Sequence, residues 1–260
     1  MNRTQSWWAA SAVALACMAA SPAWAAPVVT NVSVPDAGFT VPDSLQGARN
    51  TFLAQFDATQ TESFSSAAVG ALDPDTRPTL PVFTGGTLTP TFRLGETYRV
   101  RDTTFEGRFD TTCLVAPAPC SPRFLEASGS FNLSFGGAFN GFGFYGTDIG
   151  EFLGTLQLEL IRSDGQTTRL GTVNFDNGTG NGGALFYGFF DDESTYTGVN
   201  VFITQGNPEE GFDFFGFDDL VLGRLDDDPV DPNPTPEPGS LALVGASLLA
   251  LTAVRRRRKA

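Results

Sequence analysis

The sequence predicts an all-β domain, a two-sheet sandwich of jelly-roll-like form, between two segments that lie outside the fold. Short stretches of alternating apolar and polar residues recur, Gly and Pro separate them, and long apolar patterns with a helical period are absent. Short strands at this density are typical of two packed sheets. We therefore expect one β-sandwich domain at residues 26–225.

The clearest strand is Thr155–Arg162, in which three leucines alternate with other residues. Asp164-Gly165 follows it, and because Asp-Gly is a strong hairpin signal, we expect the return strand at Thr168–Phe175. Residues Ser130–Phe135 alternate in the same way. The other expected strands are Thr51–Phe56, Tyr98–Phe105, Ala184–Phe190, Gly198–Thr204 and Asp218–Gly223. The less patterned part before Pro90 is expected to hold an extra hairpin or a mobile loop.

Phenylalanine is concentrated in the second half of the chain, where fifteen of the 24 Phe residues lie between Phe131 and Phe217, often beside glycines. Large rings next to residues without a side chain are expected to pack as interlocking core layers, each ring burying about 150–250 Å². The alternative is a platform on which sugars stack. Such platforms usually use exposed Trp and Tyr, and residues 26–225 contain no Trp and four Tyr.

Residues 1–25 have the three-part layout of a secretory signal peptide. Arg3 precedes an apolar run from Trp7 to Ala20, and Ala23-Trp24-Ala25 forms a small-residue cleavage site. Signal peptidase is therefore expected to cut after Ala25. An uncleaved anchor is the alternative, although the apolar run is short for a bilayer of about 30 Å.

Charge excludes several classes of function. Residues 26–231 contain 28 acidic residues and 10 arginines but no Lys or His, a formal net charge of −18. Such a surface repels nucleic acids, so no nucleic-acid partner is expected. Without His, neither a Ser-His-Asp nor a Cys-His system can form, and zinc sites with imidazole ligands are excluded. The protein is therefore not expected to be an enzyme, and a hydrolase that uses two carboxylates is the weaker alternative.

Two cysteines, Cys113 and Cys120, remain once Cys17 leaves with the signal peptide, and they bracket a Pro-rich loop. An even number of cysteines in an exported chain favours a disulfide. Closing so short a loop stabilises a fold by roughly 2.5 kcal/mol. A metal site is the weaker alternative, because two thiolates are half of a ligand set.

The C-terminal tail has three parts in a fixed order. After an acidic, Pro-rich linker at residues 226–235 come Pro236-Glu237-Pro238, an apolar run at residues 240–254, and a cluster of Arg255, Arg256, Arg257, Arg258 and Lys259. As a single transmembrane helix, the run spans about 22 Å, and snorkelling arginines make up the remaining thickness. The basic cluster should stay cytoplasmic, which places residues 26–225 outside the inner membrane.

This tail, residues 236–260, resembles the PEP-CTERM sorting signal of Gram-negative bacteria, also called the ice-binding-protein C-terminal domain. The resemblance implies that an exosortase recognises Pro236, Glu237 and Pro238 and removes the tail, while Arg255–Arg258 act as a stop-transfer signal. It also implies an inner-membrane intermediate followed by the cell surface or the extracellular matrix. An anchor that is never processed is the alternative. The name implies nothing about ice binding, because the tail is a sorting device.

Two acidic phrases, Gly146–Gly150 and Gly216–Val221, place carboxylates beside glycines at expected strand edges. Asp148, Asp218 and Asp219 are therefore candidate ligands for a structural calcium ion, which takes six to eight oxygens. No other cofactor is expected. The alternative is that these carboxylates accept hydrogen bonds from backbone N–H groups in turns. The phrases loosely resemble those of β-sandwich domains that carry the same tail and have no assigned activity.

These features predict an exported structural protein of the cell surface or extracellular matrix, sorted by an exosortase and associated with exopolysaccharide. The alternative is a calcium-assisted, lectin-like carbohydrate-binding module. The first function predicts no soluble ligand. The second predicts that the protein is retained by a sugar and released on chelation.

Overall fold

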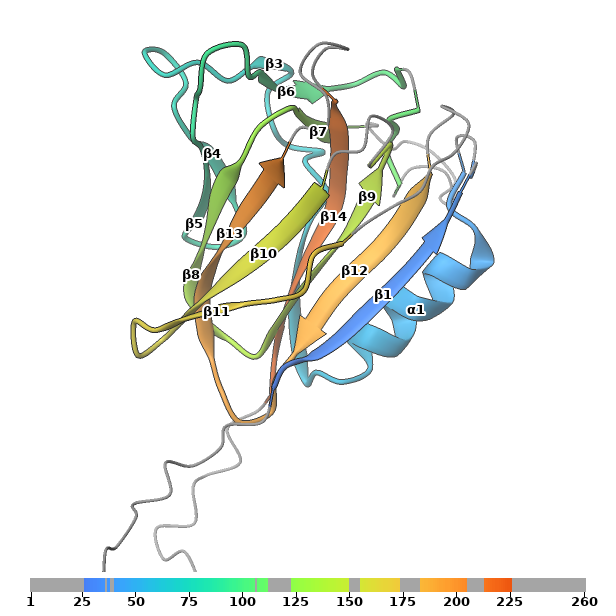
Figure 1. Cartoon of the computed structure of the whole chain (residues 1–260), viewed down its shortest axis with the longest axis vertical. Helices are drawn as coiled ribbons and strands as arrows, with labels where there is room; N and C mark the ends of the chain where they lie inside the picture. Colours follow the sequence, from blue (N-terminus) through green and yellow to red (C-terminus); the bar gives the residue numbers. More distant parts are fainter. Residues whose placement is uncertain are drawn as a thin grey trace, which may run out of the picture.

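Two antiparallel β-sheets pack face to face in the computed structural model, and this confirms the predicted sandwich (Figure 1). The structure describes residues 26–35, 37, 40–105, 107–111, 123–149, 155–173, 183–204 and 213–225. The signal peptide and the linker and tail, residues 1–25 and 226–260, lie outside this part of the chain. Within it, no helix is both long and apolar enough to span a membrane.

The larger sheet has eight strands in the order β1-β12-β9-β14-β7-β6-β3, and β2 pairs with the C-terminal half of β14. Their bounds are β1 (Val28–Val34), β2 (Ala58–Glu62), β3 (Gly70–Ala71), β6 (Tyr98–Arg101), β7 (Phe124–Ala127), β9 (Gly141–Thr147), β12 (Ala184–Phe190) and β14 (Phe215–Arg224). The central strands β9, β12 and β14 are buried along nearly their whole length. This sheet is therefore covered on both faces.

The smaller sheet has six strands in the order β11-β10-β13-β8-β5-β4. Their bounds are β4 (Leu80–Val82), β5 (Gly86–Pro90), β8 (Phe131–Phe139), β10 (Thr155–Arg162), β11 (Thr167–Arg169) and β13 (Tyr196–Thr204). Burial alternates along β5, β8 and β10, with apolar side chains inward and polar side chains outward. A strand directs successive side chains to opposite faces, so this alternation shows that, among the described residues, only the inner face of this sheet is covered.

Phenylalanine rings fill the space between the two sheets. Phe131 of β8 packs edge-on against Phe217 of β14, with ring centroids 5.1 Å apart, and Phe135 stacks on Phe142 of β9 at 5.5 Å. All four rings are buried. The prediction that the Phe-rich phrases form the core is confirmed.

The outer face of the eight-stranded sheet is covered by the one described helix, α1 (Asp43–Leu53), whose Leu45 and Phe52 are buried against it. Glycines of the sheet make room for aromatic rings from this segment. A Cβ atom on Gly188 would lie 2.9 Å from Phe52, and one on Gly223 would lie 2.2 Å from Phe56. The alternation of Phe and Gly in these strands thus places the Phe rings on the core face of the sheet. On the outer face it places glycines, which leave room for the rings of Phe52 and Phe56.

The predicted strand Thr51–Phe56 is wrong, because Thr51 to Leu53 form the last turn of α1 and Ala54 caps it. The β-branched and aromatic residues there suggest a strand. However, Leu45, Ala48 and Phe52 recur at helical spacing and pack toward the sheet as one face. Asp43 lies in the first turn of the helix, where acidic residues are favoured, and Pro42 precedes it as the N-cap residue. Tertiary burial of that face outweighs the local strand preference.

Five of the other seven strand predictions match the structure closely. Strands β10 and β12 have the predicted bounds. Strands β8, β13 and β14 each begin within three residues of the predicted first residue and end within four residues of the predicted last residue. The hairpin at Asp164-Gly165 is present, but β11 ends at Arg169, well before Phe175. Strand β6 ends at Arg101, and Phe105 instead forms an isolated bridge with Arg108. The region before Pro90 contains the hairpin β4–β5 but also β1, α1, β2 and β3.

Candidate functional site

The three candidate calcium ligands come from two neighbouring strands of the eight-stranded sheet. Asp148 follows β9, and Asp218 and Asp219 lie on the neighbouring strand β14, which pairs with β9. The pairing shifts by one residue between Asp218 and Val221, which is a β-bulge. All three aspartates are buried, and Asp148 and Asp219 have φ angles of 59° and 47°.

Each of these aspartates accepts hydrogen bonds from a different protein group. Asp148 pairs with Arg108 Nη1 at 2.5 Å, and Asp219 pairs with Arg49 of α1 through both Nε and Nη2. Oδ2 of Asp218 accepts hydrogen bonds from the backbone N–H of Thr111 at 2.7 Å and from its hydroxyl at 2.8 Å. The carboxylates thus connect α1 and the segment around Arg108 to the bulge in β14.

The described ranges contain no group of three or more His, Cys, Asp or Glu side chains arranged to hold a metal ion. The calcium site at Asp148, Asp218 and Asp219 remains a prediction. Burial raises the pKa of Asp218 well above its usual range, the negative charge of Asp110 adds to this, and the two hydrogen bonds from Thr111 oppose it. Oδ1 of Asp218 has no hydrogen-bond partner among the described residues. The environment therefore favours the protonated form of this carboxyl group.

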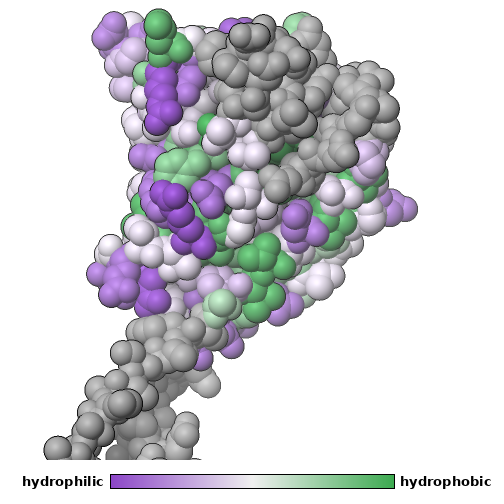
Figure 2. All heavy atoms as spheres, viewed as in Figure 1, coloured by the Kyte–Doolittle hydropathy of each residue, from purple (hydrophilic) through white to green (hydrophobic). Residues whose placement is uncertain are grey.

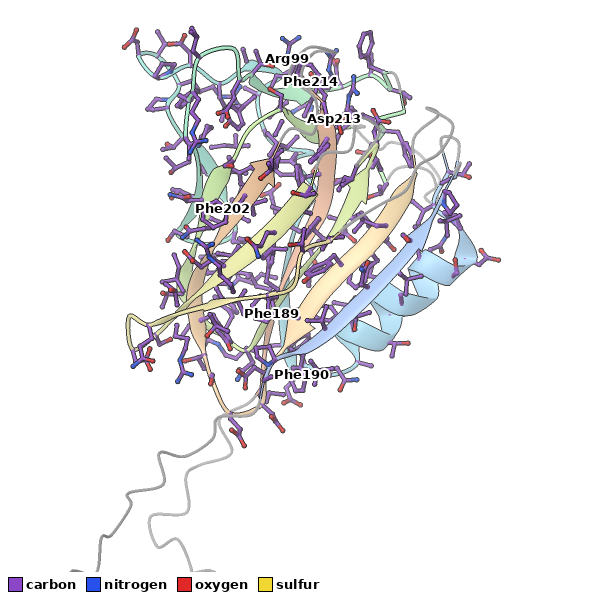
Figure 3. All side chains as sticks on the ribbon, viewed as in Figure 1. Arg99, Phe189, Phe190, Phe202, Asp213 and Phe214 are labelled. Atoms are coloured by element: carbon purple, nitrogen blue, oxygen red, sulfur yellow. The ribbon has the colours of Figure 1, made fainter. Side chains whose placement is uncertain are left out.

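A second buried charge cluster at the same end of the larger sheet was not anticipated. Glu126 of β7 accepts a hydrogen bond from Arg101 Nε at 2.5 Å and another from Arg108 Nε at 3.1 Å, and Arg99 Nε lies 3.5 Å away. Figure 3 labels Arg99, Asp213 and Phe214 at this end of the molecule. The signal in the sequence was the alternation Arg99-Val100-Arg101 on a strand. Since Glu126 is already surrounded by guanidinium groups, the cluster fits a structural role.

The outer face of the six-stranded sheet is hollowed into an open groove with a volume of about 360 Å³. Its lining comes from β5, β8, β10 and β13 and consists of Thr87, Thr89, Asn132, Leu133, Ser134, Ile161, Thr197, Gly198 and Asn200. None of these residues is charged. Figure 2 shows this face of the molecule, where hydrophilic and intermediate residues lie beside smaller hydrophobic areas.

One polar side chain from each of five strands forms a row across this face. The register of the strands places them opposite one another in the order Thr89, Asn132, Asn200, Glu159 and Arg169. Asn200 Nδ2 donates to Glu159 Oε1 at 3.1 Å, and Arg169 Nε donates to Glu159 Oε2 at 2.7 Å. These two hydrogen bonds lower the pKa of Glu159, so the carboxylate is ionised and paired. The groove therefore lies beside an ion pair whose charges balance.

An aromatic ring lies next to this row. Phe202 of β13 is opposite Gln157 of β10, and the guanidinium of Arg169 lies over its ring at 5.2 Å from the centroid (Figure 3). Arg169 therefore contacts both Glu159 and Phe202, while its own side chain is 60% exposed. The row thus ends in a partly exposed cation that covers an aromatic ring.

Amides and hydroxyls in a flat row can donate and accept hydrogen bonds at regular intervals. Neighbouring strands are about 4.8 Å apart, so the row presents a polar group at each such step across the sheet. Sequence reasoning did not identify this groove. The signal was present in Asn132 and Ser134, which alternate with the core residues of β8, but outward polar residues are also what an ordinary solvated strand shows.

A second pocket, of about 280 Å³, lies between α1 and the larger sheet. It is lined by Val41, Gln46, Arg49, Asn50, Thr111, Tyr145 and Asp219. The ion pair between Arg49 and Asp219 occupies one wall. The other sequence-predicted sites lie outside the described residues, and their roles stay predictions from the sequence. They are the cysteine pair Cys113 and Cys120, and the sorting residues Pro236, Glu237, Pro238 and Arg255–Arg258.

The chain carries a PEP-CTERM protein-sorting motif, which the family model matches at residues 234–258. This confirms the resemblance of the tail and indicates an exported protein that is handled at the membrane and processed by an exosortase. No curated protein matches the chain.

The solved structures that are similar include a family 29 carbohydrate-binding module complexed with mannohexaose, with 13% identity, a TM-score of 0.30, and coverage of 67% of this chain and 98% of that one. An arabinose-bound α-L-arabinofuranosidase has 13% identity and a TM-score of 0.39, covering 75% of this chain and 31% of that one. These likenesses are too distant to bear on what this chain binds.

Proposed function

We propose that this protein is released from the membrane by an exosortase and binds an uncharged polysaccharide through the open face of its six-stranded sheet. The observation that carries this proposal is the row of Thr89, Asn132 and Asn200 along a groove whose lining has no charged residue. Such a face suits a chain of hydroxyl groups, because each amide offers a donor and an acceptor.

The charge of the protein narrows the class of polysaccharide. Residues 26–231 have a formal net charge of −18, so a polyanionic polysaccharide is repelled over most of the surface. The groove also offers a cationic polymer no unpaired carboxylate, since Glu159 pairs with Arg169. An uncharged polymer avoids both problems. Binding is expected to be weak for each site, because an open groove leaves most of a bound chain in contact with water.

The test is retention of the exported, processed chain in native gels that contain a soluble polysaccharide. A β-glucan, a galactomannan and a dextran supply uncharged polymers, and alginate supplies an anionic one. The double variant Asn132→Ala with Asn200→Ala should lose about tenfold in affinity, because two hydrogen-bonding amides are removed. The matched control, Gln46→Ala with Asn50→Ala, removes two amides from the pocket beside α1 and should bind as the unchanged protein does.

Chelation separates this proposal from the calcium-assisted alternative. Asp148, Asp218 and Asp219 belong to the other sheet, so a chelator should leave retention unchanged if the groove alone binds the polymer. Release by chelator would favour the calcium-assisted module. Retention by none of the uncharged polymers, or equal retention of the groove variant, would contradict the proposed site.

Sorting has its own test, the intact mass of the extracellular protein from hosts with and without the exosortase. A mass that ends near Pro236, found only when the protease is present, is the expected result. A mass that still includes residues 241–260 in both hosts would contradict release and favour a membrane-anchored protein.

A further inference from the structure

The N-terminal strand β1 forms an unprotected outer edge of the eight-stranded sheet. Strand β1 pairs with β12 on one side, and no other described strand pairs with its second side. In an antiparallel ladder, every second residue of an outer strand directs its N–H and C=O groups away from the sheet. The seven-residue strand β1 therefore offers main-chain donors and acceptors to another strand at every second position.

The other outer strands have the features that normally prevent pairing with another chain. Strand β3 has two residues, β4 has a central proline at Pro81, β11 has three residues including Arg169, and β2 ends in Glu62. Short length, proline and charge are the common means of protecting an edge. Strand β1 has none of them, since its sequence Val-Val-Thr-Asn-Val-Ser-Val contains neither charge nor proline and four of its residues are valine.

The two faces of β1 differ in how they are covered. Val32 and Val34 pack against the cluster beneath α1, which holds the strand in register. Val29, Asn31 and Ser33 point to the other face and are exposed, and Val28 is 65% exposed at the beginning of the strand. The edge and its exposed valines are thus accessible along the same stretch of chain.

We propose that β1 is a self-association edge at which two copies of this chain pair their β1 strands antiparallel and join their eight-stranded sheets into one. When two copies are related by a two-fold axis, the same surface of each copy meets the other, so no second binding surface is needed. Most homodimers have this two-fold symmetry. The chain's own linker cannot occupy the edge as a strand, because residues 226–235 contain three prolines.

Electrostatics gives this interface a signature. The two copies carry like net charge, so they repel each other at a distance, whereas the paired strands themselves are uncharged. Salt screens the repulsion without weakening main-chain hydrogen bonds between neutral groups. Association through β1 should therefore strengthen as ionic strength rises, and an interface built on ion pairs would weaken.

Sedimentation velocity of the exported, processed chain, from about 10 μM to about 1 mM, tests the proposal in a range suited to weak interfaces. The expected result is a monomer–dimer equilibrium that shifts toward dimer with added salt. The double variant Val29→Lys with Asn31→Lys should lower the association constant by about tenfold or more, because like charges then meet across the paired strands. Both positions are exposed, so the fold should be retained.

The matched control is Thr59→Lys with Thr61→Lys, which adds the same charges at two exposed alternating positions of the outer strand β2. This variant should associate as the unchanged chain does. Hydrogen exchange should show concentration-dependent protection in β1 and none in β2. A chain that stays monomeric throughout, a β1 variant that associates normally, or a dimer whose protected amides lie elsewhere would overturn the proposal. The β1 variant should be retained by polysaccharide as the unchanged chain is. The test of self-association can therefore fail without bearing on the proposed polysaccharide binding at the groove, and the reverse also holds.

Discussion

The two sheets use the same alternation of residues for opposite purposes. In the eight-stranded sheet, Phe142 and Phe144 point into the core while Gly141 and Gly143 lie under the rings of Phe56 and Phe52. In the six-stranded sheet, core residues alternate with outward polar side chains such as Asn132 and Ser134. The first sheet is enclosed on both faces, and the second has a face left open to solvent.

Because of this difference, the two sheets contribute differently to stability and to binding. Glycine in the interior of a strand costs stability unless another group fills the space, and here the rings beside α1 fill it. The enclosed sheet therefore carries much of the packing energy, whereas outward side chains of the six-stranded sheet can change without loss of core contacts. Substitutions should be costly on the enclosed sheet and cheap for stability, but not for binding, on the open face.

Removal of the helix ring that covers the enclosed sheet should have the largest effect. Phe52→Ala should lower the free energy of unfolding by about 3–5 kcal/mol, because a buried ring is replaced by a cavity over Gly143 and Gly188. Urea unfolding followed by circular dichroism measures this. Thr51→Ala, an exposed neighbour on the same helix, should change it by less than about 0.5 kcal/mol. Equal effects of the two variants would show that α1 is not packed as described.

A methyl group added beneath the rings should have a smaller effect. Gly223→Ala should cost about 1–3 kcal/mol, since its Cβ would lie 2.2 Å from Phe56. The loss should be partly recovered when Phe56→Leu is combined with it, because the two positions are in contact. Gly171→Ala is the control, as nothing lies within 4 Å of its added Cβ. Strict additivity of the Gly223 and Phe56 variants would contradict this packing.

The buried carboxyl of Asp218 predicts a pH dependence of stability. Its pKa is raised in the folded state, so the folded protein binds this proton more tightly than the unfolded chain does. The stabilisation that this proton gives to the folded state is complete below the ordinary pKa of 3.8 and is lost as pH rises through the raised pKa. Asp218→Asn, which stays neutral, should therefore become more stable relative to the unchanged protein as pH increases from 4. Chemical denaturation over a pH series measures this.

An exposed aspartate gives the opposite sign. Hydrogen bonds from the backbone N–H groups of Asp75 and Thr76 lower the pKa of Asp73, so its contribution is present above pH 3.8 and is lost as pH falls. The Asp73→Asn variant should therefore be less stable than the unchanged protein near neutral pH, and this difference in the free energy of unfolding should become smaller at acid pH. The same slope for both variants would contradict the assignment of Asp218 as a carboxyl that favours its neutral form.

The open face should show the smallest changes in stability. Thr87→Ala and Ser134→Ala, which line the groove, should each change the free energy of unfolding by less than about 0.5 kcal/mol. Their thermal unfolding midpoints should match that of the unchanged protein. A large loss from either variant would show that the outer face is needed for the fold and not only for binding.

Sequence reasoning succeeded where one pattern determines the outcome. The leucines of β10 and the Asp-Gly turn fix a strand and its hairpin locally, and the tail motif is likewise read within a single segment. It failed at Thr51–Phe56, since the helix there is stabilised by a sheet formed much later in the chain. The groove was missed for a related reason: Thr89, Asn132 and Asn200 lie far apart in sequence, and only the strand register brings them into one row.

Side-chain amides give the most direct test of the claim that the open face is the binding surface. Nuclear magnetic resonance can follow the side-chain amide signals of Asn132 and Asn200 while an uncharged oligosaccharide is added, with Asn50 and Asn140 as internal references. We expect the first pair to shift with ligand concentration and the second pair to stay unchanged. Shifts confined to Asn50, in the pocket beside α1, or no shift with any uncharged oligosaccharide, would contradict the account.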